Sequence, residues 1–468
     1  MGKLYEKLAD DVAGLIREST LRPGERVPSI REIVRERRVS PATALRAYEL
    51  LESRGLIETR PRSGYYVTRR GEHAPVPRRT RAAARTTRVD VSELVFQILD
   101  AVRDRDVVPL GSAFPSPLLF PWQRLARYLG SAARHMDPWS TVQSLPPGSV
   151  ELRRQIARRY LKFGTNVSAD EIIITSGALE ALNLSLQVVT RPGDTVAIES
   201  PAFYACLQAI EALGLKAVEI PTDAREGVDL AALARVVEGH SIRACWLMTS
   251  FQNPLGATMP DDKKRELVQL LEKHDVALIE DDVYAELHFG AQRPRPAKAF
   301  DTKGHVLHCG SFSKCLAPGY RLGWVAAGKF ATAVQRRKIT TSLSTSIPVQ
   351  DGIALFLRQD AYDAHLTRLR NALASQQRAL LASVKKHFPA GYRATRPDGG
   401  YFLWLELPRG VDALKVHRLA LEAGISVAPG PIFSPRREFR NCLRLNYGHP
   451  WTADSDRAIA TLATHVSP

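Results

Sequence analysis

The sequence predicts a multidomain protein in which a small N-terminal α+β domain, built from three helices and a hairpin, precedes a large α/β domain with a mostly parallel sheet. At 468 residues the chain is longer than one ordinary domain, and 44% apolar residues are enough for a substantial core. Apolar residues recur at helical spacing within residues 1–68, whereas from residue 91 onward short apolar runs alternate with helical stretches.

The first 68 residues carry the marks of three helices. Five apolar residues recur on one face of a first helix: Leu4, Leu8, Val12, Leu15 and Ile16. A second helix follows Pro28 and Ser29, and a third begins with Ser40 as N-cap and Pro41 in its first turn. Two helices joined by a short turn predict a helix-turn-helix, whose second helix enters the DNA major groove.

The stretch LIETRPRSGYYV places two short apolar runs around the turn residues 60–64, which predicts a β-hairpin wing with a basic tip. Together, PSIREIV, VSPATALRAYELLESRGLI and RPRSGYYV resemble the winged helix-turn-helix of GntR-type bacterial regulators over residues 3–67. The resemblance implies that residues 1–68 bind double-stranded DNA. It places the contacts at Arg31, Ser40, Thr43, Arg46, Ser63 and Gly64. Many relatives carry arginine where this chain has Pro41, so the resemblance does not specify how a base is read at that point.

Residues 69–90 have no periodic apolar pattern and are expected to form a linker. Positive charge is concentrated in this part of the chain: the net charge is +3 in residues 1–68 and +6 in residues 69–88, out of +16 overall. The concentration favours a polyanion partner, with DNA the leading candidate. A solvated, arginine-rich linker is the alternative interpretation of residues 69–88.

The large domain is expected to begin at residue 91. The apolar runs EIIITSG, TVAIESP, ACWLMTS, VALIEDD and HVLHCGS alternate with helical stretches such as LEALNLSLQVV and DDKKRELVQLLEKH. This alternation is typical of strand–helix units that build a parallel sheet. The carboxyl ends of the strands are expected to carry the chemistry, because ligands bind at that edge of such sheets.

Two of these strand ends suit a phosphorylated ligand. Backbone amides at a helix start predict an anion site at Gly177, Ala178 and Leu179. Three side chains of HCGSFSKCLAPGYRLGW are expected to contact the same phosphate: Ser311, Ser313 and Arg321. Lys314 lies among them, where neighbouring cations that lower its pKa would make its amine a Schiff-base nucleophile.

Other strand ends suit a pyridine ring. Asp281, in LIEDDVYAEL, is placed to pair with a protonated ring nitrogen. Tyr284 and Asn253 are expected to donate hydrogen bonds to a phenolate oxygen of the ring. Phe203 is expected to lie flat on the ring, with Tyr204 as the second candidate.

The order of these motifs resembles that of the fold-type I aminotransferases, which bind pyridoxal 5′-phosphate (PLP). The shared pattern is Asn-Pro-x-Gly, then Asp-x-x-Tyr, then Ser-x-Ser-Lys with arginine seven residues later, while PDGGYFLWLELP and NCLRLNYG resemble the family's small domain. The resemblance implies a PLP-binding domain over residues 91–465 with a smaller C-terminal α+β subdomain from about residue 345. It also implies that Lys314, Asp281 and Tyr284 are the catalytic groups and that Arg444 grips an α-carboxylate.

The chain departs from that pattern at two places. Ala178 stands where the family usually has a hydroxyl residue, and Gln143 lies about where many members lend a tyrosine to the partner subunit's phosphate. These departures assign more of the phosphate binding to Arg321 and the serines.

Several classes are not favoured by the sequence. The five cysteines form no Cys-x-x-Cys pair, so neither a disulfide framework nor a metal site is expected. The N-terminal stretch is amphipathic and acidic residues interrupt it, unlike a signal peptide, and no apolar run is long enough to span a membrane. We expect a cytoplasmic protein.

A winged helix joined by a long linker to an aminotransferase-like domain resembles the MocR subgroup of bacterial regulators. The resemblance implies a homodimeric, PLP-dependent transcription regulator whose effector is an amine or amino acid. Two alternatives stay open. The chain could be a working aminotransferase with an accessory DNA-binding domain, because every group needed for transamination is present. It could also be a plain DNA-binding protein that uses the large domain only to dimerise.

Overall fold

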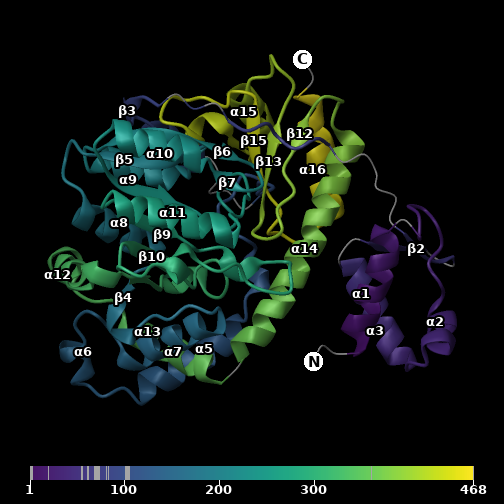
Figure 1. Cartoon of the computed structure of the whole chain (residues 1–468), viewed down its shortest axis with the longest axis horizontal. Coiled ribbons are helices and arrows are strands. Elements are labelled where there is room, and N and C mark those ends of the chain that lie inside the picture. The colour runs from purple at the N-terminus through teal and green to yellow at the C-terminus, as the bar shows by residue number, and fades with distance from the viewer. Residues whose placement is uncertain are drawn as a thin grey trace. The chain divides into compact units, whose positions relative to one another are not determined.

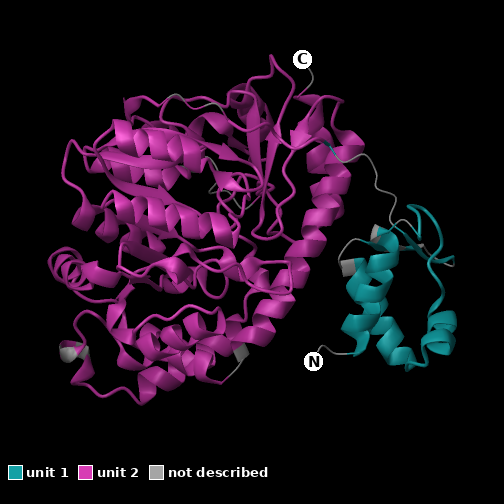
Figure 2. Cartoon of the chain, viewed as in Figure 1, with its two compact units in different colours: residues 1–74 teal, residues 75–468 magenta. Residues whose placement is uncertain are grey.

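The computed structural model describes residues 4–466 except 19, 54–55, 61–62, 68–73, 81, 83, 101–105 and 360. It divides the chain into two compact units, residues 1–74 and residues 75–468, shown in different colours in Figure 2. Each unit has its own hydrophobic core. The wing-tip residues 61–62 and the linker residues 69–73, 81 and 83 lie outside the described residues.

Unit 1 is the predicted winged helix-turn-helix. Its elements are α1 (Leu4–Arg17), α2 (Ile30–Arg37), α3 (Pro41–Ser53) and the antiparallel strands β1 (Ile57–Arg60) and β2 (Gly64–Val67). A capping box at Ser29 and Glu32 starts α2, because each side chain accepts a hydrogen bond from the other residue's backbone amide. The apolar faces of the helices and wing meet in one core that includes Leu8, Val12, Ile33, Ala44, Tyr48, Leu51, Ile57 and Val67.

Unit 2 is built on a nine-stranded mixed sheet. Along the sheet the order is β3 (Thr86–Arg88), β6 (Lys216–Asp223), β5 (Thr195–Ser200), β8 (Ile242–Leu247), β9 (Ala277–Asp281), β10 (Val306–Ser311), β11 (Gly323–Ala326) and β4 (Ile172–Thr175), with β7 (Gly227–Val228) paired to β6. The five central strands from β6 to β10 are parallel, as predicted. The strands β3, β7 and β11 run antiparallel to their neighbours.

Helices cover both faces of this sheet (Figure 1). The core on one face includes residues of α4 (Ser92–Asp100), α8 (Ala178–Val189) and α9 (Tyr204–Ala212), and the core on the other includes residues of α10 (Leu230–Gly239) and α11 (Asp261–Lys273). Neighbouring strand residues alternate between the two cores, as Val196 and Ala197 do on β5. Because helices cover both faces of the sheet, the sequences of the central strands are continuous apolar runs.

The rest of unit 2 consists of further helices and a second, smaller sheet. The helices are α5 (Trp122–Arg134), α6 (Ser140–Gln143), α7 (Val150–Lys162), α12 (Ala331–Thr341), α13 (Ile347–Arg358), α14 (Ala361–His387), α15 (Ala413–Glu422) and α16 (Ala453–Thr464). In Figure 1, α14 runs as one long helix from the region of α5, α7 and α13 to the small sheet. That sheet is antiparallel and has the order β12 (Arg393–Ala394), β13 (Phe402–Glu406), β15 (Cys442–Asn446) and β14 (Ala428–Pro429).

The second part of the expected linker differs from the prediction, because the described residues between 75 and 90 pack on other parts of unit 2. The carbonyl of Pro75 accepts from the amide of Ala394 on β12, whereas Thr80 bonds to Thr222 on β6, and residues 86–88 form the edge strand β3. A three-residue strand has no measurable period, so pattern analysis assigned it to the linker. We call residues 75–90 the strap.

Within the described part of the chain, no helix is long and apolar enough to cross a membrane. The same residues hold no group of three or more His, Cys, Asp or Glu side chains that is arranged to bind a metal ion. All five cysteines are buried free thiols.

Candidate functional site

The predicted polar groups stand at one edge of the large sheet. Asp281 and Ser311 end the parallel strands β9 and β10, and Asn253 follows the parallel strand β8. Gly177 follows β4, which runs in the same direction as β10 because both are antiparallel to β11. The carboxyl ends of these four strands therefore meet at one edge, where α/β sheets bind ligands.

Gly177 and Arg321 form a tight cradle at the start of α8. Gly177 has φ +87°, and a Cβ atom on it would lie 2.7 Å from Nη2 of Arg321. Arg321, also at positive φ (50°), lies with Nη1 3.4 Å from the Ser313 hydroxyl oxygen. The amides of Ala178 and Leu179 belong to the first turn of α8, where N–H groups have no intrahelical acceptor. A guanidinium beside a helix N-terminus favours an anion such as a phosphate.

The Ser311 hydroxyl is buried and hydrogen-bonded within the protein. Its hydroxyl oxygen lies 3.0 Å from both Ser313 Oγ and the carbonyl oxygen of Leu322, and it accepts a hydrogen bond from the Ser313 amide. These bonds close the loop that carries Lys314. Ser313 contacts Arg321 of the cradle, and the contacts of Ser311 and Ser313 with a phosphate stay predictions.

Lys314 is only partly exposed, and its amine has contacts with two residues of the segment 111–114. Nζ donates to the carbonyl of Ala113 at 2.9 Å and lies 3.6 Å from the centre of the Phe114 ring. Burial, with added repulsion from Arg321 and Arg444, lowers the pKa of Lys314 to about 7, against the opposing charge of Asp281. A lysine with this pKa is about half neutral near pH 7, and the neutral amine is the nucleophilic form.

Asp281, Asn253 and Tyr284 are all buried. The Oδ1 atom of Asp281 and the Nδ2 atom of Asn253 are buried and have no hydrogen-bond partner in the described part of the chain. Burial, together with the charge of Asp282, raises the pKa of Asp281 to about 7. Leaving buried polar atoms unpaired costs about 1 to 3 kcal/mol each, so these two atoms indicate a ligand that would satisfy them.

The two candidates for ring stacking are neighbours at the start of α9. Phe203 is the N-cap residue of α9, and its ring centre lies 4.8 Å from that of Tyr204. Tyr204 is buried in the core on this face of the sheet, and Phe203, which is partly buried, packs against the same core. The more exposed position of Phe203 favours it as the stacking ring, and this assignment stays a prediction.

Arg444 reaches the site from the small sheet. It is fully buried at 1% exposure, and its guanidinium donates to Asn253 Oδ1 at 3.1 Å and to the carbonyl of Gly111 at 2.7 Å. Its Cζ lies 4.1 Å from the centre of the Phe402 ring. Burial lowers the pKa of Arg444. The Arg444–Asn253 bond joins the small subdomain to the large one at the site itself.

Sequence reasoning missed residues 111–114, which lie across the site. The carbonyls of Gly111 and Ser112 accept from Arg444, and the carbonyl of Ala113 accepts from Lys314 and from Tyr401. These contacts use backbone atoms, so no side-chain motif could indicate them. The only sequence signal is Gly111, where a Cβ atom would lie 2.7 to 2.9 Å from backbone atoms of Val427.

In unit 1 the predicted DNA contacts divide into two kinds. Arg31 and Arg46 are exposed on α2 and α3, with side chains free to reach a phosphate or a base. The Ser40 hydroxyl accepts from the Thr43 amide at 3.1 Å and also lies 2.8 Å from the Thr43 hydroxyl, so both residues cap α3.

The wing carries the other two predicted contacts. Ser63 Oγ lies 2.6 Å from the hydroxyl of Tyr66, and Gly64 has φ +101°. A Cβ on Gly64 would touch the guanidinium of Arg26 at 3.4 Å. Arg26, which was not predicted, therefore adds a cation beside the wing.

Comparison with known proteins agrees with this division. Residues 4–67 match the family of bacterial regulatory proteins named gntR, and residues 133–462 match aminotransferase class I and II. Two proteins of Escherichia coli (strain K12), named uncharacterized HTH-type transcriptional regulators YdcR and YjiR, are 47% and 38% identical to the chain. YdcR matches over 98% of both chains, and YjiR matches over 99% of this chain and 98% of its own.

Solved structures resemble unit 2. The kynurenine aminotransferase of Pyrococcus horikoshii, solved with PMP, matches with a TM-score of 0.73 and 30% identity, over 81% of this chain and 94% of its own. The α-aminoadipate aminotransferase LysN of Thermus thermophilus, solved with N-(5′-phosphopyridoxyl)-L-leucine, matches with a TM-score of 0.73 and 28% identity, over 81% and 95%. Both predicted resemblances are thereby confirmed at the level of fold and family. The chain belongs to the MocR-type family of HTH-type transcriptional regulators, in which a gntR-family domain precedes an aminotransferase domain of class I and II.

Proposed function

We propose that this protein is a transcription regulator that binds double-stranded DNA through unit 1 and uses unit 2 to bind PLP together with an amine or amino acid effector. The observation that carries the proposal is the convergence of Lys314, Asp281, Arg321 and Arg444 at one sheet edge. These groups occur in a chain whose first unit exposes Arg31 and Arg46. A regulator of this kind would act in the cytoplasm.

The residues present fit PLP. The Gly177–Arg321 cradle suits the phosphate, and the unpaired oxygen of Asp281 suits a protonated ring nitrogen. The unpaired Nδ2 of Asn253 suits the phenolate oxygen. When bound, PLP supplies two things: an aldehyde that captures amines, and a ring that withdraws electrons.

The protein side chains would divide the remaining work. Lys314, held partly neutral by its surroundings, would be the amine that holds PLP and, when it is not bound to PLP, the group that could hold a proton near the ligand Cα. Arg444 grips the ligand carboxylate through two N–H groups. To do so it exchanges the carbonyls of Gly111 and Ser112 for the carboxylate, so residues 111–114 must move when the ligand enters.

The same groups support a second candidate function, an aminotransferase with an accessory DNA-binding domain. The neutral Lys314 amine and the Asp281 carboxylate are the acid–base groups that turnover needs. A protein of Thermus thermophilus named 2-aminoadipate transaminase is 30% identical over 75% of this chain. Turnover with a keto acid would therefore not by itself argue against regulation.

The strap offers a route from the ligand to the DNA-binding unit. Its first residues bond to the small subdomain, through Pro75 and Ala394, whereas Thr80 bonds to Ser200 and Thr222 of the large sheet. Few residues separate these two anchors, and Pro75 is the first residue of unit 2. Movement of Arg444 and its subdomain over a ligand would therefore pull on the chain that leads to unit 1.

We also expect a homodimer. Trp139 and Val142 lie at the helix α6, and each is 67% exposed, which is high for large apolar side chains. Gln143 ends the same helix, at the place where relatives lend a residue to the partner subunit, and its side chain lies outside the described part of the structure.

Two parallel titrations test the proposal. Purified protein should gain a visible absorption band with PLP, and it should bind the DNA immediately upstream of its own coding sequence with an affinity that falls steeply with salt. Replacing Thr80 with Val keeps the size of the side chain but removes its bonds to Ser200 and Thr222. This change should weaken the effect of a ligand on DNA binding without changing the band.

The matched control is Thr87→Val, on the same strap. Its hydroxyl bonds only to the nearby Arg85 carbonyl among the described contacts, so the ligand response should stay unchanged. Absence of the band in the wild-type protein would exclude the PLP site. A band without DNA binding would leave the aminotransferase as the better function.

A further inference from the structure

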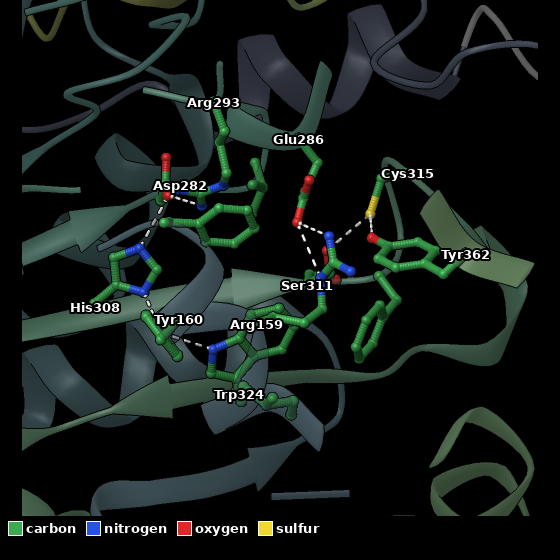
Figure 3. A pocket seen from close by; sticks show the side chains of 14 residues that line it. Arg159, Tyr160, Asp282, Glu286, Arg293, His308, Ser311, Cys315, Trp324 and Tyr362 are labelled. Atoms are coloured by element: carbon green, nitrogen blue, oxygen red, sulfur yellow. Dashed lines mark hydrogen bonds and ion pairs between the residues drawn. The ribbon is translucent and has the colours of Figure 1, made fainter. Parts of the chain in front are cut away.

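A small pocket lies beside the end of β9, on the side to which Asp282 points (Figure 3). Its volume is about 30 Å³, enough for about two water molecules. Charged and polar side chains line much of it, among them Asp282, His308, Tyr160, Arg293 and Glu286. The proposed cofactor role uses none of them.

Hydrogen bonds from three elements converge on Asp282 in a fixed order. The indole N–H of Trp324 on β11 can only donate, and it donates to the Tyr160 hydroxyl oxygen at 2.9 Å. The Tyr160 hydrogen is therefore directed to Nδ1 of His308 at 2.6 Å. With Nδ1 accepting, His308 carries its hydrogen on Nε2 and donates it to Asp282 Oδ2 at 3.0 Å.

The charges around Asp282 favour its ionised form. Arg293 donates to Asp282 Oδ2 at 2.5 Å, and both side chains are buried. Burial alone would raise the pKa of Asp282, but Arg293 and His308, with the charge of Lys264, hold it below its usual range. The other carboxylate that lines the pocket, Glu286, forms ion pairs with Arg159 and Arg370. The ion pair of Arg293 is with Asp282.

Asp281 and Asp282 are adjacent, so their side chains leave the strand end on opposite sides. The Asp282 amide donates to the Cys309 carbonyl at 3.0 Å, which ties this strand end to β10. The side-chain bonds of Asp282 fall on Oδ2, and the Oδ1 atoms of both Asp281 and Asp282 are buried without a hydrogen-bond partner in the described part of the chain. The groups whose charge acts on Asp281 are Asp282 and Lys314, and Glu199 on β5 lies close enough to interact with it. Burial raises the pKa of Glu199 to about 8, so Glu199 is mostly neutral below that pH.

We propose that Asp282 is a positioning residue for Asp281. Clamped by Arg293 and the Trp324–Tyr160–His308 chain, it fixes the end of β9 and places one permanent negative charge behind the carboxylate that would face the cofactor ring nitrogen. The consequence for the cofactor rests on the proposed function, whereas the effect of Asp282 on Asp281 does not.

The test replaces Asp282 with Asn, which keeps the shape of the side chain and removes its charge. In the PLP-free protein the infrared band of the protonated carboxyl group of Asp281 is identified by its loss in Asp281→Asn and is followed from pH 5 to pH 8. Without the charge of Asp282 the proton affinity of Asp281 should fall by about tenfold, which is one pKa unit. In the PLP-loaded protein the pH midpoint of the visible band should fall in the same direction.

Tyr160→Phe is the second variant, in case Asp282→Asn does not fold. It removes only the hydroxyl that fixes His308. The midpoints of the infrared band and of the visible band should both shift in the same direction as in Asp282→Asn. The expected change in proton affinity is about two- to threefold, which is a fraction of one pKa unit. Asp363→Asn is the matched control. Asp363 belongs to the same charged region, but it pairs with Lys162 and Arg159 and is half exposed, so neither midpoint should move.

A change in thermal stability with unchanged midpoints in both variants would show that the cluster is structural only and would overturn the proposal. Unshifted midpoints in Tyr160→Phe would overturn it if Asp282→Asn fails to fold. If wild-type protein gains no visible band with PLP, the proposed function fails, and the infrared arm still decides the relation between Asp282 and Asp281.

Discussion

The pH at which Lys314 captures PLP follows from its surroundings. With a pKa of about 7 in place of the ordinary 10.5, half of the Lys314 amines are neutral at pH 7, against roughly one in 3,000 for an unperturbed lysine. Arg444 adds a positive charge that disfavours protonation of Lys314, and Asp281 adds an opposing negative charge. Arg444→Gln should therefore raise the midpoint of capture by roughly one pH unit, and Asp281→Asn should lower it.

The assay mixes PLP-free protein with PLP at a series of pH values and follows the rate at which the visible band appears. The wild-type rate should rise through a midpoint near pH 7 and level off above pH 8. The shift for Asp281→Asn should be smaller than that for Arg444→Gln, because Asp281, with a pKa of about 7, is itself only partly charged in this range. A wild-type midpoint above pH 9, or shifts of the same sign in both variants, would refute the electrostatic account of Lys314.

Three further perturbations have defined outcomes. Gly177→Ala should weaken PLP binding by about tenfold or more, because its Cβ would lie 2.7 Å from a guanidinium nitrogen of the cradle; Gly193→Ala has a similar φ and open space, and equilibrium titration should find its affinity unchanged. Lys314→Met should stabilise PLP-free protein at pH 7 by about 2 to 3 kcal/mol, less than the roughly 5 kcal/mol of the full pKa difference because the side chain keeps some solvent contact. In the wild-type protein the pKa of Lys314 is lower in the folded state than in the unfolded state, so protonated Lys314 destabilises the fold fully below pH 7. The difference in stability between wild type and Lys314→Met should therefore vanish as the pH rises to 10.5. Denaturant unfolding at several pH values will check this. Arg31→Ala and Arg46→Ala should each weaken DNA binding and reduce its salt slope by about 1 without changing the PLP band; unchanged slopes in both would remove α2 and α3 from the interface.

The sequence was informative where one short pattern decides local structure. The alternation of apolar runs with helical stretches predicted the parallel sheet, and strand direction then put Asp281 and Asn253 at one edge. The caps at Ser29 and Ser40 located the helix starts of unit 1. These features depend on residues close together in the chain, so a pattern records them.

Other features depend on contacts between distant residues. The clamp on Asp282 joins Tyr160, His308 and Arg293, which come from three separate segments. Residues 111–113 act through carbonyl groups, which every sequence contains. The strap has a three-residue strand whose place is set by the edge of β6, so its own residues did not reveal it.

The central claim is that a ligand bound in unit 2 changes the DNA affinity of unit 1. The most direct measurement titrates the DNA upstream of the coding sequence with PLP-loaded protein, with and without an amino acid or amine that shifts the visible band. For ordinary coupling of about 1 to 3 kcal/mol the affinity should change about 5- to 150-fold. Lys314→Ala should keep basal DNA binding and lose the response. If ligands shift the band and turn over with a keto acid while the DNA affinity of wild-type protein stays the same, the protein is an aminotransferase with an accessory domain and the regulatory account is contradicted.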